Sequence, residues 1–486
     1  MKKIKTFGTF FLFIAVVLCS IALPLWSAER DYVVERIIHP EFDKHKRYFD
    51  DPRPVFTNWS WKKNMPPEQY AVYASDPEVT KRLWAETIGF KAPDVVGKIA
   101  PEIKPGKYSY NDKEKYPGLK ALMVPALYER FKPGVAPSLA GNFPEMEIVP
   151  TRQYPWNLKI AQATKDNAGQ AKLDEKGYLI SKTLRPGFPF PKPSGKFAAQ
   201  QYLYNNRQNY ITGEDSYGVI RQTGFSKNLK PDYGSKGIIC YLRLQGRAVT
   251  PTRPDGFFDE RAKARDETLN FRVEFYAPRD RFGDALLSTY YNDVDKLDTI
   301  FMYIGALRRV RKLSNTDTQD TTGGSDYTYL DSFGFSQKMS PTLYPYKYEI
   351  VEDREYLFPY TIDGSDYLTS KGAEWHGLKF ERRPVVVLKL TQLDKNFIYS
   401  KRMIYVDKET FQILHAEMYD QKGRLWRTYT HLSYYDTGTG IHSMTKQLIQ
   451  DHLDVHTSIN QAYFMPTVGW SQRNKFDITS LQDAVK

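Results

Sequence analysis

The sequence predicts an α+β protein built on a large antiparallel sheet. Residues 382–436 form several short runs rich in β-branched and aromatic residues, separated by the polar turns 407–410 and 420–423. This pattern is typical of an antiparallel meander. Residues 271–275 alternate apolar and charged side chains, as a half-buried strand does. The region before residue 150 is instead punctuated by prolines, which predicts an irregular arm.

Residues 1–28 have the layout of a secretory signal. Three lysines precede an uncharged apolar run over residues 7–23, and Pro24 and Ala28 follow before the first acidic residue. We predict cleavage after Ala28. The apolar run approaches the length of a membrane span, so an uncleaved anchor is the alternative. No later run approaches a span, and the body is therefore predicted to lie outside the cytoplasm.

Residues 29–150 are predicted to be a proline-rich arm that packs on the sheet. A short helix fits residues 77–88, after a cap at Ser75 or Asp76. Further along, residues 186–195 read PGFPFPKPSG, a proline density that forbids both helix and strand. The two phenylalanines of this segment favour packing onto the fold over recognition by a proline-binding module.

Residues 151–486 are predicted to form the main β domain. A helix fits within 157–176, and residues 443–448 fit a strand or a short helix. Residues 314–331 are polar and glycine-rich and are predicted to be a loop. Strands are predicted at 217–226, 237–250, 269–277, 286–293, 299–310 and 347–360.

The meander is apolar on both of its predicted faces. If Val406 pairs with Phe411, Ile404 faces Ile413 on one side of the hairpin. The other side then carries Met403, Tyr405, Leu414 and Met418, with Lys401 among them. A sheet that is apolar on both faces must be covered on both. Helices and loops are the common cover, and an apolar ligand is the alternative for one face.

Composition excludes some classes of function. The formal net charge is +12, but the basic residues are spread thinly, with the densest cluster at 308–312. A nucleic-acid-binding protein would show a basic stripe on a recognisable module, so no nucleic-acid partner is predicted. Of the two cysteines, Cys19 lies in the apolar leader, and Cys240 is predicted to be a small buried residue.

Motifs for catalysis, cofactors and metals are absent or incomplete. The sequence has no GxSxG, Walker or GxGxxG motif, so no cofactor is predicted. His452 and His456 are spaced as on one helix face, but Leu453 stands where a zincin has glutamate. The acidic residues of loop 314–331 lack the glycine spacing of an EF-hand, so no metal is predicted. His415 and His431 lie in the meander, where a role in acid–base catalysis is the less favoured alternative to a structural one.

Several segments resemble one proteobacterial family, known as domain of unknown function 1329. The similarity runs from about residue 150 to the end, and the meander block is its most specific part. The segments are residues 187–195, 303–311, 355–360, 399–414 and 419–426. The resemblance implies the lipoprotein-carrier fold, in which a strongly curved antiparallel sheet forms an unclosed β-barrel whose concave face is plugged by helices. It also implies a periplasmic location and association with membrane exporters of the resistance-nodulation-division (RND) type.

The function that this resemblance implies is transport of a lipid or another hydrophobic molecule. An acyl chain is held mainly by the area it removes from water, so no catalytic constellation is required. An envelope hydrolase using His415 or His431, and a structural protein without a ligand, are the alternatives. Arg308 and Arg309, with Arg311, are predicted at a rim, where they would meet an anionic headgroup. The predicted lining residues are Phe271, Val273, Phe275, Val386, Leu388, Met403, Tyr405, Leu414 and Met418.

Overall fold

The computed structural model describes residues 61–208, 210–314, 317–321, 324–362, 369–371, 373–468 and 473–481. The predicted signal segment, residues 1–28, lies outside the described residues. Among the described residues, no helix is long and apolar enough to cross a membrane.

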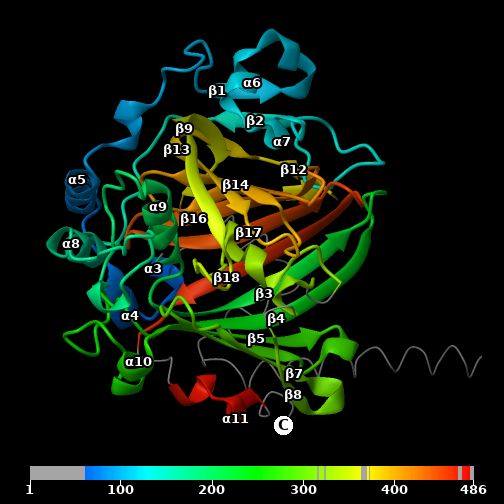
Figure 1. Ribbon diagram of the computed structural model, residues 1–486. Helices are drawn as coiled ribbons and strands as arrows, with labels where there is room; N and C mark the ends of the chain where they lie inside the picture. The colour runs from blue at the N-terminus through cyan, green and yellow to red at the C-terminus, as the bar shows by residue number, and fades with distance from the viewer. Residues whose placement is uncertain are drawn as a thin grey trace, which may run out of the picture.

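One large sheet of sixteen strands organises the molecule. In Figure 1 it runs from β9 and β13 at the top, through β14, β16, β17 and β18, to β7 and β8 at the bottom. Neighbouring strands are antiparallel except where β2 pairs with β13 and β10 with β16. Among the described residues β8 pairs only with β7, while β1 and β9 lie at the other end, so the sheet curves without closing into a barrel. The unclosed barrel predicted from the sequence is therefore confirmed.

Four of the predicted strands, 217–226, 269–277, 286–293 and 347–360, are observed with shifts of one or two residues at their ends. The strand predicted at 237–250 instead spans 231–243, and the one predicted at 299–310 is divided into two strands by a short 3-10 turn at 305–307. The first half of the sheet comprises β3 (Asp215–Phe225), β4 (Pro231–Arg243), β5 (Glu267–Ala277), β6 (Ala285–Tyr291), β7 (Thr299–Ile304) and β8 (Arg309–Lys312). The second half comprises β9 (Tyr346–Pro359), β10 (Thr361–Ile362), β13 (Lys379–Gln392), β14 (Lys401–Asp407), β15 (Ile413–Tyr419), β16 (Leu425–Asp436), β17 (Ile441–Asp451) and β18 (His456–Pro466). The arm adds β1 (Gly106–Ser109) and β2 (Glu145–Ile148), and β11 (Thr369–Lys371) pairs with β12 (Glu374–His376) as a separate ribbon.

Short helices gather mainly at one end of the curved sheet, where α3, α4, α5, α8 and α9 lie together in Figure 1. Helix α5 coincides with its predicted span. Asp76 caps it by accepting hydrogen bonds from the backbone N–H groups of Glu78 and Val79, and Gly89 ends it in the left-handed conformation. The helices are α3 (Trp61–Asn64), α4 (Pro67–Tyr73), α5 (Pro77–Ile88), α6 (Gly118–Leu122), α7 (Pro125–Tyr128), α8 (Leu158–Asp166), α9 (Ala198–Arg207), α10 (Glu260–Arg265) and α11 (Ile478–Leu481).

The predicted register of the first meander turn is wrong. Val406 pairs with Ile413, and Phe411 stands outside the ladder with a positive φ of 58°. A bulge between Tyr405 and Val406 then makes Met403 and Tyr405 the partners of Glu417 and His415. Met418 is opposite Arg402, on the other face. The four meander residues expected on one face are therefore divided between the two faces.

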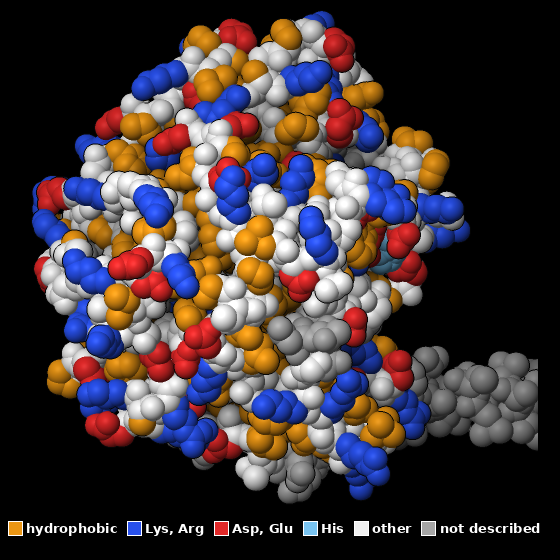
Figure 2. Space-filling view, viewed as in Figure 1, with side chains coloured by type: hydrophobic (Ala, Val, Ile, Leu, Met, Phe, Trp, Pro, Cys, Tyr) orange, Lys and Arg blue, Asp and Glu red, His pale blue; other side chains and the backbone are white. Residues whose placement is uncertain are grey.

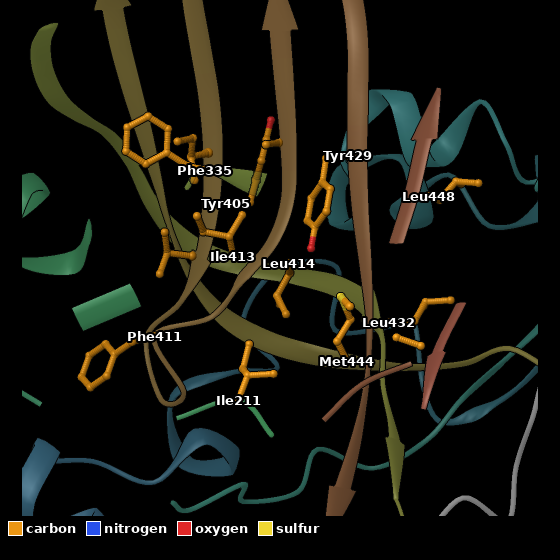
Figure 3. Close-up of a cluster of buried hydrophobic side chains, with 14 of the residues drawn as sticks. Ile211, Phe335, Tyr405, Phe411, Ile413, Leu414, Tyr429, Leu432, Met444 and Leu448 are labelled. Carbon is orange, nitrogen blue, oxygen red and sulfur yellow. The ribbon is translucent and has the colours of Figure 1, made fainter. Parts of the chain in front are cut away.

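Protein covers both faces of the meander. On one face Arg130 of the arm reaches Thr430, and Gly141 approaches Leu448. On the other lie residues 324–340, which we call the plug segment. Gly334 of this segment packs so closely on Ile413 and Tyr429 that a Cβ would be 2.6 Å from Ile413. Figure 3 shows the buried apolar cluster that results, including Phe335 of the plug segment together with Leu414 and Tyr429.

Candidate functional site

A cavity of about 410 Å³ lies on the concave face of the sheet, over β3 to β8. The register explains its wall. Ile239, Val273, Leu286 and Met302 are consecutive cross-strand partners on β4, β5, β6 and β7, and all four side chains line the cavity. A parallel row joins Tyr241, Phe271 and Ser288. Alternating side chains of a strand point to the same face, so these rows present one apolar surface to the space.

The plug segment and the end of α9 close the cavity on its other side. Phe333, Phe335 and Met339 come from the plug segment, and Leu203 and Ile211 come from α9 and the residues that follow it. An ion pair fixes the plug segment to the sheet. Arg402 of β14 donates to Asp331 with an N–O distance of 2.8 Å, and neither side chain is exposed.

Charged side chains lie at the two ends of the cavity. Arg243, opposite Leu269 of β5, lies at one end together with Glu214. The Glu214 carboxylate already has hydrogen-bond partners within the chain, because it accepts from the backbone N–H groups of residues 248–250. At the other end, beyond Phe275 of β5, lie Arg281 and Asp284.

The Arg281 guanidinium stacks 3.8 Å from the centre of the Phe275 ring, and burial lowers the pKa of Arg281. Arg311 and Asp320 are exposed lining residues of the cavity. The face in Figure 2 carries basic and acidic side chains interspersed, with no extended patch of one sign.

Of the predicted lining residues, the three on β5 lie on the cavity: Phe271, Val273 and Phe275. Arg311 also lines it, whereas Arg308 and Arg309 are exposed to solvent away from the wall.

The six predicted residues of β13, β14 and β15 are not in the cavity wall. By register, Val386, Leu388 and Met418 belong to the same sheet face as the cavity, yet they are at most 1% exposed within the packed core. Leu414 lies in the buried cluster of Figure 3. Met403 and Tyr405 lie on the opposite face of the sheet, away from the cavity. The structure does not bring these six residues together with the β5 residues.

Sequence reasoning missed the polar part of the wall, which includes Gln222, Gln447 and Asn460. It also missed the aromatic side chains that the plug segment contributes. Both come from stretches without an apolar alternation, so the hydrophobic pattern alone gave no signal for them.

Neither meander histidine is among the residues that line the cavity, and the two lie on opposite faces of the sheet. His415 is opposite Tyr405 on one face, where its Nδ1 lies 3.1 Å from the Thr430 hydroxyl. His431 is on the other face, with its Nδ1 2.9 Å from the Tyr429 hydroxyl. Burial lowers the pKa of each to about 3. Both imidazoles are therefore neutral at pH 7, and they do not form a joint acid–base site.

The histidines considered as zinc ligands lie in a hairpin rather than on a helix. His452 is in the β17–β18 turn and His456 begins β18. His456 bonds Asp326 of the plug segment and Asp232 of β4. The described residues contain no group of three or more His, Cys, Asp or Glu arranged to hold a metal ion. Cys240 is buried in β4.

Comparison with solved structures finds matches at low sequence identity. A candidate outer membrane lipoprotein-sorting protein domain from Vibrio parahaemolyticus has 18% identity and a TM-score of 0.40, covering 57% of this chain and 95% of its own. A DUF1329 family protein from Desulfovibrio piger has 16% identity and a TM-score of 0.39, covering 55% and 91%. A LolA superfamily protein from Nitrosomonas europaea has 14% identity and a TM-score of 0.36, covering 58% and 98%.

No curated protein matches the chain. The model of the family described as "Protein of unknown function (DUF1329)" matches residues 131–481, which include every strand around the cavity. The chain therefore belongs to the DUF1329 family.

Proposed function

We propose that the protein is a periplasmic carrier that binds one hydrophobic molecule in the cavity over β3 to β8. The observation that supports this most is the space left there between the sheet and its plug, beside a meander that is filled by its own side chains. The cavity, at about 410 Å³, falls within the range of about 300–1,000 Å³ that is common for small-molecule sites. Its wall is mainly apolar along β4 to β7.

The energetics favour an elongated apolar ligand. Each CH₂ group transferred from water into such a space contributes about 0.8 kcal/mol. The apolar rows on β4 to β7 provide that environment without any reactive group. A carrier needs no chemistry on its cargo, which fits a cavity wall that contains no histidine or cysteine among the described residues.

The periplasmic location is the part of the proposal that depends on the N-terminus. Residues 1–28 carry the three lysines, the apolar run and the small residue of an export signal. N-terminal sequencing of the protein purified from the periplasm tests it, and we expect the chain to begin at Glu29.

Cooperation with an exporter of the RND type is a further part of the proposal and rests on the family resemblance alone. Cross-linking in intact cells followed by purification tests it. An RND subunit recovered only with the cross-linked carrier supports this part. Its absence removes the partnership and leaves the carrier proposal unaffected.

The experiment on the carrier itself is native mass spectrometry, with lipid extraction, of protein purified from the periplasm. We expect a bound lipid-sized mass and binding of the apolar dye N-phenyl-1-naphthylamine. Val273→Trp, which fills the cavity from β5, should weaken dye binding by at least about tenfold, because the apolar area offered to the dye is lost.

Val351→Trp is the matched control, because Val351 is a strand valine that is 43% exposed on β9 and away from the cavity wall. It should bind dye like the wild type. An empty wild-type protein that does not bind the dye would contradict the carrier function. Equal binding by both variants would place the dye elsewhere.

A further inference from the structure

Three carboxamide side chains form a row across the cavity face of the sheet. Gln222 of β3 is the direct cross-strand partner of Asn460 of β18, and Asn460 is the partner of Gln447 of β17. All three line the cavity, and none is more than 7% exposed. This polar row lies beside the apolar rows of β4 to β7 in the cavity wall.

The amide oxygen of the middle member has no hydrogen-bond partner within the described part of the chain. The Gln222 Oε1 accepts from the Ser235 hydroxyl at 2.7 Å, and the Gln447 Nε2 donates to the Tyr429 hydroxyl at 3.4 Å. Asn460 is 2% exposed, and its Oδ1 has no partner among the residues that the structure describes. A buried amide oxygen without a donor is costly, so such a group in a cavity indicates a partner that arrives from outside the chain.

A second buried asparagine shows how a purely structural carboxamide is treated in this fold. Asn205 of α9 accepts from the Phe190 N–H at 2.9 Å and donates to the Phe190 carbonyl at 2.6 Å. Both of its polar atoms are satisfied, and it is not part of the cavity wall. Asn460 differs from Asn205 in both respects.

We propose that Asn460 binds a neutral polar group of the ligand, and that this group is a hydroxyl. A hydroxyl can donate to the Asn460 Oδ1 and accept from its Nδ2 at the same time. The three side chains of the row are uncharged, so a carboxylate or ammonium at this position would lose its hydration without meeting an opposite charge. This inference rests on the proposed carrier function and narrows its cargo to a hydrophobic alcohol.

The test is displacement of N-phenyl-1-naphthylamine by three probes that each have a chain of eight carbons: 1-octanol, octyl methyl ether and octanoate, whose eighth carbon is that of the carboxylate. In the wild-type protein we expect 1-octanol to bind roughly three- to tenfold more tightly than the ether, which cannot donate a hydrogen bond. Octanoate should bind more weakly than both.

Asn460→Leu should abolish the preference for 1-octanol over the ether and leave ether binding within about twofold of the wild type. The unfolding midpoint of the ligand-free variant should be unchanged or higher, because the substitution removes an unsatisfied buried group. Asn205→Leu is the matched control. It should lower the unfolding midpoint and keep the preference for 1-octanol.

The possible outcomes distinguish a failure of the hydroxyl assignment from a failure of the carrier function on which it rests. If neither the dye nor any octyl probe binds the wild-type protein, the carrier function fails. If the probes bind but 1-octanol has no advantage, or keeps its advantage in Asn460→Leu, only the assignment of a hydroxyl to Asn460 fails. Tighter binding of octanoate than of 1-octanol would also overturn it, in favour of an anionic cargo.

Discussion

The two halves of the sheet obey the same alternation but differ in what lies against their concave face. Over β14 to β16 the plug segment packs directly on the strands, with Gly334 against Ile413 and Tyr429. At the β14–β15 turn, Phe411 packs on Trp84 and Phe188 with ring centres 6.1 and 5.3 Å away. Over β3 to β8 the same cover leaves a cavity of about 410 Å³. An apolar strand face therefore predicts that the face is buried. It does not predict whether packed side chains or a cavity lie against it.

Both halves bury ion pairs. In the cavity half, Arg247 donates to Asp215 of β3 at 2.7 Å, and each side chain is 2% exposed. The meander buries a network around Arg383, which donates to Asp407 and Glu409 with N–O distances of 2.7 and 2.6 Å. None of these side chains is exposed. Around the cavity, Arg281 and Asp284 are partly open to solvent, and their closest N–O distance is 3.8 Å. The two halves therefore differ in the ion pair that lies beside the cavity, and not in whether they bury charge.

The largest effect is expected from removing Arg383, the central cation of the buried network in the meander. Arg383→Met leaves Asp407 and Glu409 buried without a counter-charge, and we expect it to lower the free energy of unfolding by about 3–5 kcal/mol. Urea denaturation measures the change.

Arg424→Met is the control for this substitution. Arg424 pairs with Asp420 in the β15–β16 turn, but its side chain is 56% exposed. Its loss should therefore cost less than about 1 kcal/mol. If the two substitutions cost the same, the buried network is not what stabilises the meander.

A matched pair of leucine truncations sharpens the difference in packing. Leu388 on β13 is 0% exposed in the filled half, and Leu286 on β6 is 5% exposed in the cavity wall. Leu388→Ala opens a new cavity and should cost about 3–5 kcal/mol of unfolding free energy.

Leu286→Ala enlarges existing space, because the Leu286 side chain lines the cavity. It should cost about 2 kcal/mol or less when measured on the ligand-free protein. A larger loss for Leu286→Ala than for Leu388→Ala would mean that the cavity side of the sheet is as tightly packed as the meander.

The strands could be predicted because their apolar alternation and polar turns are local signals. The register of the first meander turn could not, because Phe411 adopts a positive φ and leaves the ladder to join the aromatic side chains of α5 and the proline-rich segment. That choice depends on Trp84 and Phe188, which are more than two hundred residues away in the sequence.

The cavity was predicted only in part for a related reason. Val273 was predicted on the inward face because apolar and charged side chains alternate along β5. Asn460 was missed because polar residues are expected to face water, whereas β18 turns this carboxamide inward beside Gln222 and leaves Ile459 on the other face. A polar residue that faces a cavity is therefore predicted on the wrong face of its strand when only the sequence is used.

The smallest expected effect concerns the contact that holds the plug segment over the cavity half. His456 of β18 joins Asp326 of the plug segment through Nδ1 at 2.6 Å and Asp232 of β4 through Nε2 at 3.1 Å. Burial alone would lower the pKa of His456, but the hydrogen bonds and charges of the two carboxylates outweigh it and raise the pKa above its usual value. Burial also raises the pKa of Asp326.

The protonated imidazole therefore stabilises the cavity half in a defined pH window. Its contribution is complete below the unfolded pKa of about 6.5 and is lost as the pH rises through the raised pKa of the folded protein. We expect the wild-type protein to lose more unfolding free energy than His456→Gln between about pH 6 and about pH 9. An identical pH dependence in wild type and His456→Gln would show that closure of the cavity half does not use this histidine.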